Sequence, residues 1–368
     1  MILSQYLFLL IPLGFVPLIA KFMFPHRITL MEWVITTVAT SAVFCIVMAL
    51  AVESNLSNTE VLNGKVLSKF RDRVSCEHSY QSCSGSGDDR TCTTKYEHSF
   101  DYDWVARTSV GDVKIDRIDR QGRREPTRYS NIVIGESASV ESRYKDYLKA
   151  SPDSLFNFDP STLEQYSSSV PKYPKVYDYY RFNRFVFLGD RFGEYDVRHW
   201  NAKLNVRLED LSKKIQGNII VAMSNGEPML FDALQYHWNG GKKNDVILGV
   251  GVNEDGYVKW FNSTSFMNGF GNSVMHANLR MDALDKEINY DLISSLVDRI
   301  ETDFKRHSMS DEIAMLDAYT PPWWVFFLSI GAGLLTAVGA SYKFANNHNR
   351  VSPYNPDWVV KLKRKFNK

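Results

Sequence analysis

Residues Asp245 to Phe261 read DVILGVGVNEDGYVKWF, and this stretch sets the fold class of the central part of the chain. Its first part, Asp245 to Val252, is apolar at every position after Asp245 and has the length of a buried strand. The polar residues Asn253 to Gly256 predict a hairpin turn, and Tyr257 to Phe261 predicts a further strand. We therefore expect a sheet whose strands lie in the interior of a folded domain.

The sequence around this stretch alternates strand patterns with helix patterns. Arg184 to Leu188 (RFVFL) and Gly217 to Ser224 (GNIIVAMS) are short apolar runs that predict buried strands. Apolar residues with a helical period occur in three segments: Asp196 to Ile215, a segment with Leu230, Leu234 and Trp238, and Asp291 to Phe304. Strands that alternate with helices predict an α/β domain over residues 175–309, with a sheet covered on both faces.

A small β-rich module is predicted before it, over residues 53–149. Its first segment, Ser54 to Arg73, is polar and predicts a helical stem. Residues 94–109, 111–122 and 131–140 then alternate polar and apolar positions, as half-buried strands do. The charged run Asp116 to Arg120 is expected to be the solvated face of a strand. Residues 150–174 are rich in Ser, Pro and Tyr and predict a linker or an extended packing segment.

Three of the four cysteines, Cys76, Cys83 and Cys92, lie in this module. In an oxidising compartment two of them should pair, and the spacing leaves open which two. The third is left for a partner chain, a thiol modification or a metal. A zinc site that combines these cysteines with His78 or His98 is the competing interpretation, although the spacings are not the tight pairs of zinc ribbons.

Three segments have the length and composition of transmembrane helices: residues 2–20, 33–52 and 323–342. Each is close to the ~20 residues that cross ~30 Å of hydrocarbon. Trp33, Trp323 and Trp324 lie at their ends, where amphipathic rings favour the interface. Residues 1–52 thus predict two membrane helices, with Cys45 a free thiol in the second, and residues 310–342 predict a connector and the third. A cleaved signal peptide is the alternative for the first segment, but it lacks a basic start.

Basic residues predict the orientation of these helices. Lys21, His26 and Arg27 lie in the loop between the first two, and the tail at residues 343–368 is rich in Lys and Arg. Both should be cytoplasmic by the positive-inside rule. We therefore expect a multi-pass protein of the inner (plasma) membrane, with its N-terminus outside, residues 53–320 extracytoplasmic and the C-terminus cytoplasmic.

The third predicted helix has a stripe of small residues that recur every four positions: Ser329, Gly333, Ala337 and Ser341. Small side chains on one face let another helix approach closely. The neighbour is either one of the first two helices or a second copy of the chain, in which case the protein is a homo-oligomer.

The block from Asn201 to Lys305 resembles the TPM domain, a family named for thylakoid, photosystem-repair and acetylcholine-receptor-modulating members. The resemblance rests on the order helix, GNIIVAMS, helix ending in Trp, then WNGGKKNDVIL and the hairpin VGVNEDGYVKW. The residues that match are Trp238, Gly241, Lys242, Asn244 and Asp245. The segment FNSTSFMNGFGNSVMH at residues 261–276 departs from the family pattern, and the match covers under a third of the chain. The N-terminal part is similar to uncharacterised membrane proteins of large tailed phages.

The TPM resemblance implies an αβα sandwich held near the membrane. It also implies a role in maintaining membrane complexes and, in some members, weak phosphatase activity or calcium binding. Side chains at the strand ends could form such a divalent-cation site: Asp232, Asn244, Asp245, Asn253 and Asp255. Hard cations need several oxygens that converge on one point. The alternative for each of these residues is a helix cap or turn former.

The sequence contains no P-loop, GxSxG or HExxH motif. The net charge of +1 gives no indication of nucleic-acid binding, and the absence of ionisable residues at the centres of the membrane segments argues against transport. The sequence therefore predicts a protein without catalytic residues or a cofactor, which displays an outer domain to bind another envelope or membrane protein. A TPM-like metal-dependent phosphatase, or a membrane-complex maintenance factor that uses a cation such as calcium, is the alternative.

Overall fold

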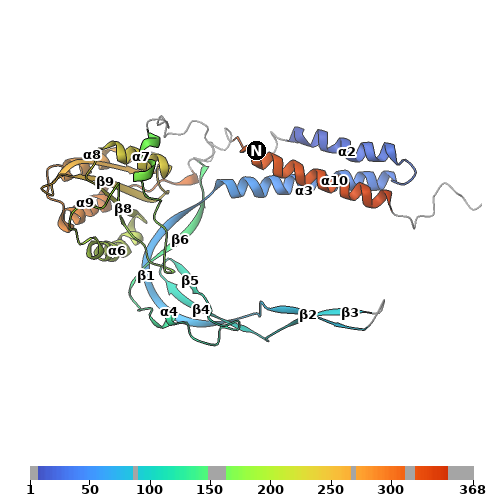
Figure 1. Ribbon diagram of the computed structural model, residues 1–368, viewed down its shortest axis with the longest axis horizontal. Coiled ribbons are helices and arrows are strands. Elements are labelled where there is room, and N and C mark those ends of the chain that lie inside the picture. Colours follow the sequence, from blue (N-terminus) through green and yellow to red (C-terminus); the bar gives the residue numbers. More distant parts are fainter. Residues whose placement is uncertain (1–6, 86–89, 148–162, 267–270, 311–319, 347–368) are drawn as a thin grey trace, which may run out of the picture. The chain divides into compact units, whose positions relative to one another are not determined.

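The structure is a computed structural model that describes residues 7–85, 90–147, 163–266, 271–310 and 320–346 (Figure 1). The chain forms two compact units. One contains the apolar helices at the two ends of the chain. The other, over residues 58–144 and 155–308, contains the sheets.

The α/β part of the second unit is built on a four-stranded sheet in the order β10-β9-β8-β7. Its strands are β7 (Phe185–Phe187), β8 (Asn218–Ser224), β9 (Asp245–Val252) and β10 (Val258–Ser265). β7, β8 and β9 are parallel, whereas β10 returns antiparallel to β9. Every residue of β8 and β9 is buried, as their unbroken apolar sequences predict.

Helices cover both faces of this sheet. On one face, α6 (Val197–Lys214), α8 (Ser273–Ala283) and α9 (Tyr290–Asp303) share a core with Ile219, Val221 and Met223 of β8. On the other face, α7 (Met229–His237) shares a core with Ile220 and Ala222 of the same strand. Alternate residues of β8 point to opposite faces, so one apolar run supplies both cores. The predicted mixed α/β architecture with a doubly covered sheet is confirmed.

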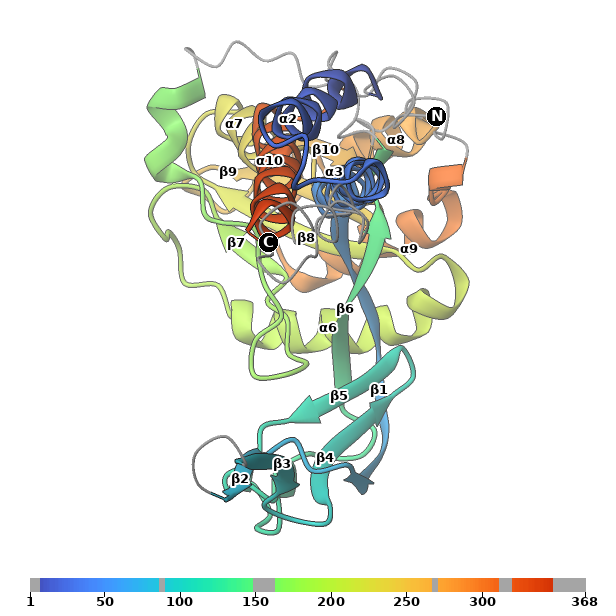
Figure 2. The same cartoon turned by 90° about the vertical axis from the view of Figure 1, so that its right-hand side faces the viewer.

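A second four-stranded sheet has the order β5-β4-β1-β6. It consists of β1 (Ser57–Val74), β4 (Asp101–Thr108), β5 (Gly111–Ile115) and β6 (Ser137–Lys145). Figure 2 shows β1 beside β6, and β1 is a long strand in both figures. Residues 127–130 form the short helix α4, and β2 (Ser79–Ser84) and β3 (Thr91–Tyr96) form a separate hairpin.

The helical stem predicted for Ser54 to Arg73 is wrong from Ser57 onward, because β1 begins there; the three residues before it are the end of α3. β1 pairs antiparallel with β4, with Phe70 opposite Val105, and it buries Val61 and Val66. Leu62, Val66 and Phe70 recur every four positions in this segment, as apolar residues of a helix do. Its extended form is instead stabilised by strand partners that come much later in the chain, which is why local propensity is a poor guide to strands.

Two smaller predictions in this module also need correction. β5 ends at Ile115, so Asp116 to Arg120 is a loop and not a strand face. The Asp119 carboxylate shapes this loop, because it accepts the backbone N–H groups of Gln121, Arg123 and Arg124. The strand predicted for residues 131–140 begins only at Ser137.

The predicted linker at residues 150–174 is described from residue 163 onward. It contains the 3₁₀ helix η4 (Glu164–Ser169), and Tyr166, Val170 and Tyr173 pack against the α7 side of the α/β sheet. The described part is therefore a packing segment. The rest lies outside the described residues.

The first unit contains η1 (Leu7–Leu9), α2 (Leu10–Met23), α3 (Leu30–Leu56) and α10 (Trp323–Ala345). α3 and α10, with 27 and 23 residues, are long and apolar enough to cross a membrane. α2 is apolar but has 14 residues, and the first residues of the predicted span lie outside the described part. α3 begins at a capping box, in which Thr29 accepts the Glu32 N–H and the Glu32 carboxylate accepts the Thr29 N–H.

The small-residue stripe of α10 is its buried face: Ser329, Gly333, Ala337 and Ser341. Ser329 Oγ lies 3.6 Å from Met48 Sδ of α3. A Cβ added to Gly333 would lie 3.0 Å from Leu13 Cδ1 of α2. The helices that the stripe contacts are therefore α2 and α3 of the same chain.

Candidate functional site

The β2–β3 hairpin is closed by a disulfide bond between Cys83 and Cys92, which lie directly opposite each other in the strand register. The expectation that two of the three outer cysteines pair is thus confirmed, and the structure identifies the pair. Cys76 and Cys45 are free thiols. Cys76 is left at the base of the hairpin, just before β2.

The strands of this hairpin are almost entirely exposed. In β2 and β3 every residue except Ser82 is exposed, and the tyrosines Tyr80 and Tyr96 are 51% and 61% exposed. Tyr96 lies opposite Ser79, so the two tyrosines point to opposite faces of the hairpin. An isolated two-stranded hairpin is marginally stable in water. The disulfide therefore supplies the stability that burial does not.

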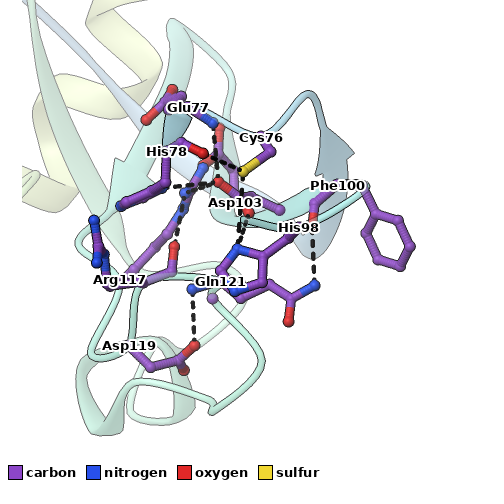
Figure 3. A network of polar contacts seen from close by, with 12 residues as sticks. Cys76, Glu77, His78, His98, Phe100, Asp103, Arg117, Asp119 and Gln121 are labelled. Carbon is purple, nitrogen blue, oxygen red and sulfur yellow. Dashed lines mark hydrogen bonds and ion pairs between the residues drawn. The ribbon is translucent and has the colours of Figure 1, made fainter. Parts of the chain in front are cut away.

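At the base of the hairpin, four side chains from its two arms lie close together, of which Figure 3 labels Cys76, His78 and His98. Asp101 is fully buried and lies at the centre. His98 Nδ1 is 3.3 Å from Asp101 Oδ1, and His78 Nδ1 is 3.4 Å from Asp101 Oδ2. The thiol of Cys76, which is 7% exposed, lies 3.8 Å from His98 Nδ1. We refer to Cys76, His78, His98 and Asp101 as the base cluster.

A second layer of polar groups holds the central carboxylate. Asp101 Oδ2 accepts hydrogen bonds from Arg117 Nη1 at 3.1 Å and from the Glu77 N–H at 3.2 Å. Burial alone would raise the pKa of the Asp101 carboxyl. Hydrogen bonds from the Glu77 N–H and from the cysteine and histidine side chains, with the charge of Arg117, outweigh burial and keep this pKa below its ordinary value. The carboxylate is therefore ionised at neutral pH.

Arg117 belongs to the charged run for which the sequence predicted a solvated strand face. Its side chain is 14% exposed and also binds Asp103, with Nη2 2.6 Å from Oδ1. Lys114 Nζ lies 2.5 Å from the other oxygen of Asp103. A cleft of about 620 Å³ lies beside these groups and is lined by His78, Asp103 and Arg117 among others. Solvent thus reaches one side of the base cluster.

The base cluster contains the residue types of a Cys–His–Asp catalytic triad, but its geometry is different. In such a triad the two ring nitrogens of the histidine have separate roles, one toward the nucleophile and one toward the carboxylate. Here Nδ1 of His98 faces both the Cys76 thiol and Asp101. Several lone-pair atoms thus point to one place, which suits the binding of a cation better than proton relay.

The five residues predicted as divalent-cation ligands are not brought together. Asp245 is fully buried at the start of β9 and accepts from Tyr173 Oη, Asn218 Nδ2 and the Lys242 N–H at 2.9, 2.8 and 2.7 Å. Burial raises the pKa of Asp245 to about 6, and these hydrogen bonds limit the rise. Asn244 is also buried, and its amide donates to the backbone of Val61 and Gln216.

The other three predicted ligands lie elsewhere. Asn253 and Asp255 follow the opposite end of β9, and a strand of its length spans about 25 Å. Asn253 Oδ1 accepts the Tyr257 N–H at 2.8 Å, which is the contact of a turn former. Asp232 is half-buried on α7, and burial raises its pKa. Of these residues, Asn244, Asp245 and Asn253 have structural contacts that explain their positions.

Sequence reasoning did not identify Arg184, the largest fully buried side chain of the described residues. Its guanidinium donates to Asn63 Oδ1 (2.5 Å), Ser139 Oγ (3.0 Å), Asn205 Oδ1 (3.0 Å) and Asn218 Oδ1. These acceptors come from β1, β6, α6 and β8, so one side chain joins both four-stranded sheets. Burial lowers the pKa of Arg184 to about 9. An arginine before an apolar run carries no local signal of this role.

Three further histidines, His199, His237 and His276, are separate from the base cluster. His199 and His237 are exposed. His276 is largely buried, with Ser263 Oγ 2.7 Å from Nδ1 and Ser265 Oγ 3.0 Å from Nε2. Burial lowers the pKa of His276 to about 4, so it is neutral at pH 7.

No known family model, curated protein or solved structure matches the chain. The resemblance to the TPM domain and the similarity to phage membrane proteins stay predictions.

Proposed function

We propose that this chain is an integral membrane protein of the inner (plasma) membrane that displays its sheet-containing unit outside the cytoplasm, where it binds another envelope or membrane protein. The observation that carries the proposal is the Cys83–Cys92 disulfide, which lies in the segment between α3 and α10. Disulfides form and persist in oxidising compartments. The disulfide therefore agrees with the side that the basic loop before α3 predicts for this segment.

In this topology α2, α3 and α10 anchor the chain. The lengths and compositions of α3 and α10 support two spans. The first span is proposed from the predicted segment at residues 2–20, of which α2 is the described part. The short loop with Lys21 and Arg27 then lies on the cytoplasmic side, and α3 leads outward.

The stapled hairpin is the proposed contact element. It buries almost nothing of its own, yet a disulfide holds its shape. Both strands have a free outer edge in the two-stranded sheet of the described residues, and such an edge can take up a strand of another protein. Tyr80 and Tyr96 add rigid amphipathic contact area on the two faces, as tyrosines commonly do at binding surfaces.

Site-specific photo-crosslinking of the full chain in membranes tests this function. A photoreactive residue at Tyr80 or Tyr96 should give a discrete adduct with another protein. The matched control is Val274 on α8, which is 72% exposed. The adduct should weaken when Cys83 and Cys92 are both replaced by Ser. The proposal fails if neither hairpin position gives a discrete adduct, or if the Val274 control gives the same one.

The TPM-like alternative has support in the order of helices and strands between Asn201 and Lys305 and in the doubly covered sheet. A metal-dependent phosphatase or maintenance activity at the predicted residues has less support, because Asp245 and Asp255 lie at opposite ends of β9. A homo-oligomer through the α10 stripe also has less support, since α2 and α3 cover that face.

A further inference from the structure

We propose that the base cluster binds one Zn²⁺ ion. Cys76, His78 and Asp101 are three of its ligands, and His98, which adjoins Cys76 and Asp101, becomes the fourth when its ring turns toward the ion. Cys76 and His78 come from the arm that leads into β2, whereas His98 and Asp101 come from the arm that leaves β3. The ligand atoms of Cys76, His78 and Asp101 all lie within 4.8 Å of one another.

The distances between the ligand atoms fit a tetrahedral zinc site. With bonds of about 2.1 Å to nitrogen and oxygen and about 2.3 Å to sulfur, neighbouring ligand atoms of a tetrahedron are about 3.4 Å apart, or about 3.6 Å for a sulfur–nitrogen pair. His98 Nδ1 is 3.3 Å from Asp101 Oδ1, and Cys76 Sγ is 3.8 Å from His98 Nδ1. His98 is thus spaced from Cys76 and from Asp101 as zinc ligands are, and Cys76, His78 and Asp101 lie within 4.8 Å of one another.

Two buried atoms of the base cluster make no well-aligned hydrogen bond among the described residues: His78 Nδ1, which lies 3.4 Å from Asp101 Oδ2, and Asp101 Oδ1, which lies 3.3 Å from His98 Nδ1. Leaving a buried polar atom unsatisfied is costly, and such atoms in native structures call for an explanation such as an ion. A cation between them satisfies both atoms at once. This observation is independent of the ligand spacing.

The surroundings of Asp101 orient it as a ligand. Its Oδ2 is held by Arg117 Nη1 and by the Glu77 N–H, which leaves Oδ1 to face His98. Metal-binding carboxylates are commonly fixed in this way by a second layer of hydrogen bonds. The Arg117 guanidinium is itself held by Asp103.

The ligand types select zinc. A thiolate and two imidazoles are poor ligands for calcium and magnesium, which take oxygen. Two histidines and a cysteine also occur in copper sites, but there the fourth ligand is commonly a long, weak thioether, whereas here it is a carboxylate. With the His98 ring turned toward the ion, four protein ligands complete a tetrahedron, as in structural zinc sites.

A zinc ion at this place would clamp the two arms of the hairpin at its base, while the Cys83–Cys92 disulfide closes it further out. The cleft beside His78 and Arg117 provides an entry path. The inference does not depend on which protein the hairpin binds. If the chain binds no zinc, the result expected from the crosslinking experiment on the proposed function stays the same.

Zinc titration of the purified full chain in detergent tests the site. Competition with a chromophoric chelator should show one Zn²⁺ per chain, and Co²⁺ in its place should give a thiolate-to-cobalt charge-transfer band. Cys76→Ser should remove the band and weaken zinc binding by about 100-fold or more, and His98→Ala should weaken it by at least about 10-fold. The controls Cys45→Ser and His237→Ala should match the unmodified chain.

The proposal is overturned if the unmodified chain binds no zinc or gives no thiolate band with Co²⁺. It is equally overturned if Cys76→Ser keeps the affinity of the unmodified chain, or if Cys76 is found in a disulfide with another thiol. The integrity of the Cys83–Cys92 bond, checked by mass spectrometry, shows whether a variant has folded. If the Cys76 variant fails this check, the cobalt spectrum of the unmodified chain decides.

Discussion

Replacing Arg184 with Met should destabilise the sheet-containing unit, because this side chain links β1, β6, α6 and β8. Its guanidinium makes four hydrogen bonds, to Asn63, Ser139, Asn205 and Asn218, and no part of it is exposed. Met has a similar length and no donor. The substitution therefore removes the four bonds without creating a large cavity.

Two opposing effects set the size of the loss. Hydrogen bonds to a charged group contribute about 2 kcal/mol each, so the four together contribute about 8 kcal/mol. Against this stands the cost of burying the charge. Burial lowers the pKa of Arg184 from 12.5 to about 9, which corresponds to about 5 kcal/mol. The difference predicts that Arg184→Met lowers the free energy of unfolding by about 3 kcal/mol.

Equilibrium unfolding of the full chain in detergent, followed by tryptophan fluorescence, measures this change. The matched control is Arg198→Met on the exposed surface of α6, which should shift the free energy of unfolding by less than about 0.5 kcal/mol. Arg184→Lys keeps the charge but lacks the planar fork that reaches four acceptors, so it should recover less than half of the loss. The reasoning is refuted if Arg184→Met behaves like the control or if Lys restores full stability.

Three further predictions concern other parts of this unit. Because burial lowers the folded-state pKa of His276 from 6.5 to about 4, the chain should lose up to about 3 kcal/mol of stability as the pH falls from 6.5 to 4. The His276→Gln variant should lack this part of the pH dependence in urea unfolding, and parallel pH profiles would contradict the assignment. Gly251→Ala would place a Cβ 2.0 Å from Trp260 Nε1, so it should cost about 2 kcal/mol; an unchanged Tm would show that the site can relax. Replacing Cys83 and Cys92 with Ser should speed amide exchange in β2 and β3 while the α/β sheet keeps its protection, and unchanged protection of the hairpin would count against its dependence on the disulfide.

The α/β sheet could be predicted from sequence because its information is local. Residues 219–223 of β8 and 246–252 of β9 are apolar without interruption, and each strand is followed by a turn signal. α6, α7 and α9 show their buried faces as leucines and isoleucines with a helical period. β1 could not be predicted in this way. It is long and largely polar, and its extended form depends on β4, whose first residue follows the end of β1 by 27 positions.

The base cluster was only partly visible in the sequence. A cysteine next to histidines suggested a metal, but which cysteine was free depended on the register that places Cys83 opposite Cys92. Asp101 and Arg117 were assigned to strand patterns, because their contact crosses 16 positions of chain. The predicted cation ligands failed to converge for the converse reason. Asp245 begins β9 and Asp255 lies in the turn after it, so the full length of an extended strand separates them.

The central claim is that the sheet-containing unit lies outside the cytoplasm, and thiol labelling of spheroplasts tests it most directly. The introduced thiols are Val133→Cys, at a position that is 63% exposed, and Arg27→Cys in the loop between α2 and α3, with Cys45 and Cys76 replaced by Ser. A membrane-impermeant maleimide should label the thiol at position 133 in intact spheroplasts and the thiol at position 27 only after permeabilisation. Labelling at position 27 but not at 133 in intact spheroplasts, or at neither position before permeabilisation, would contradict the account.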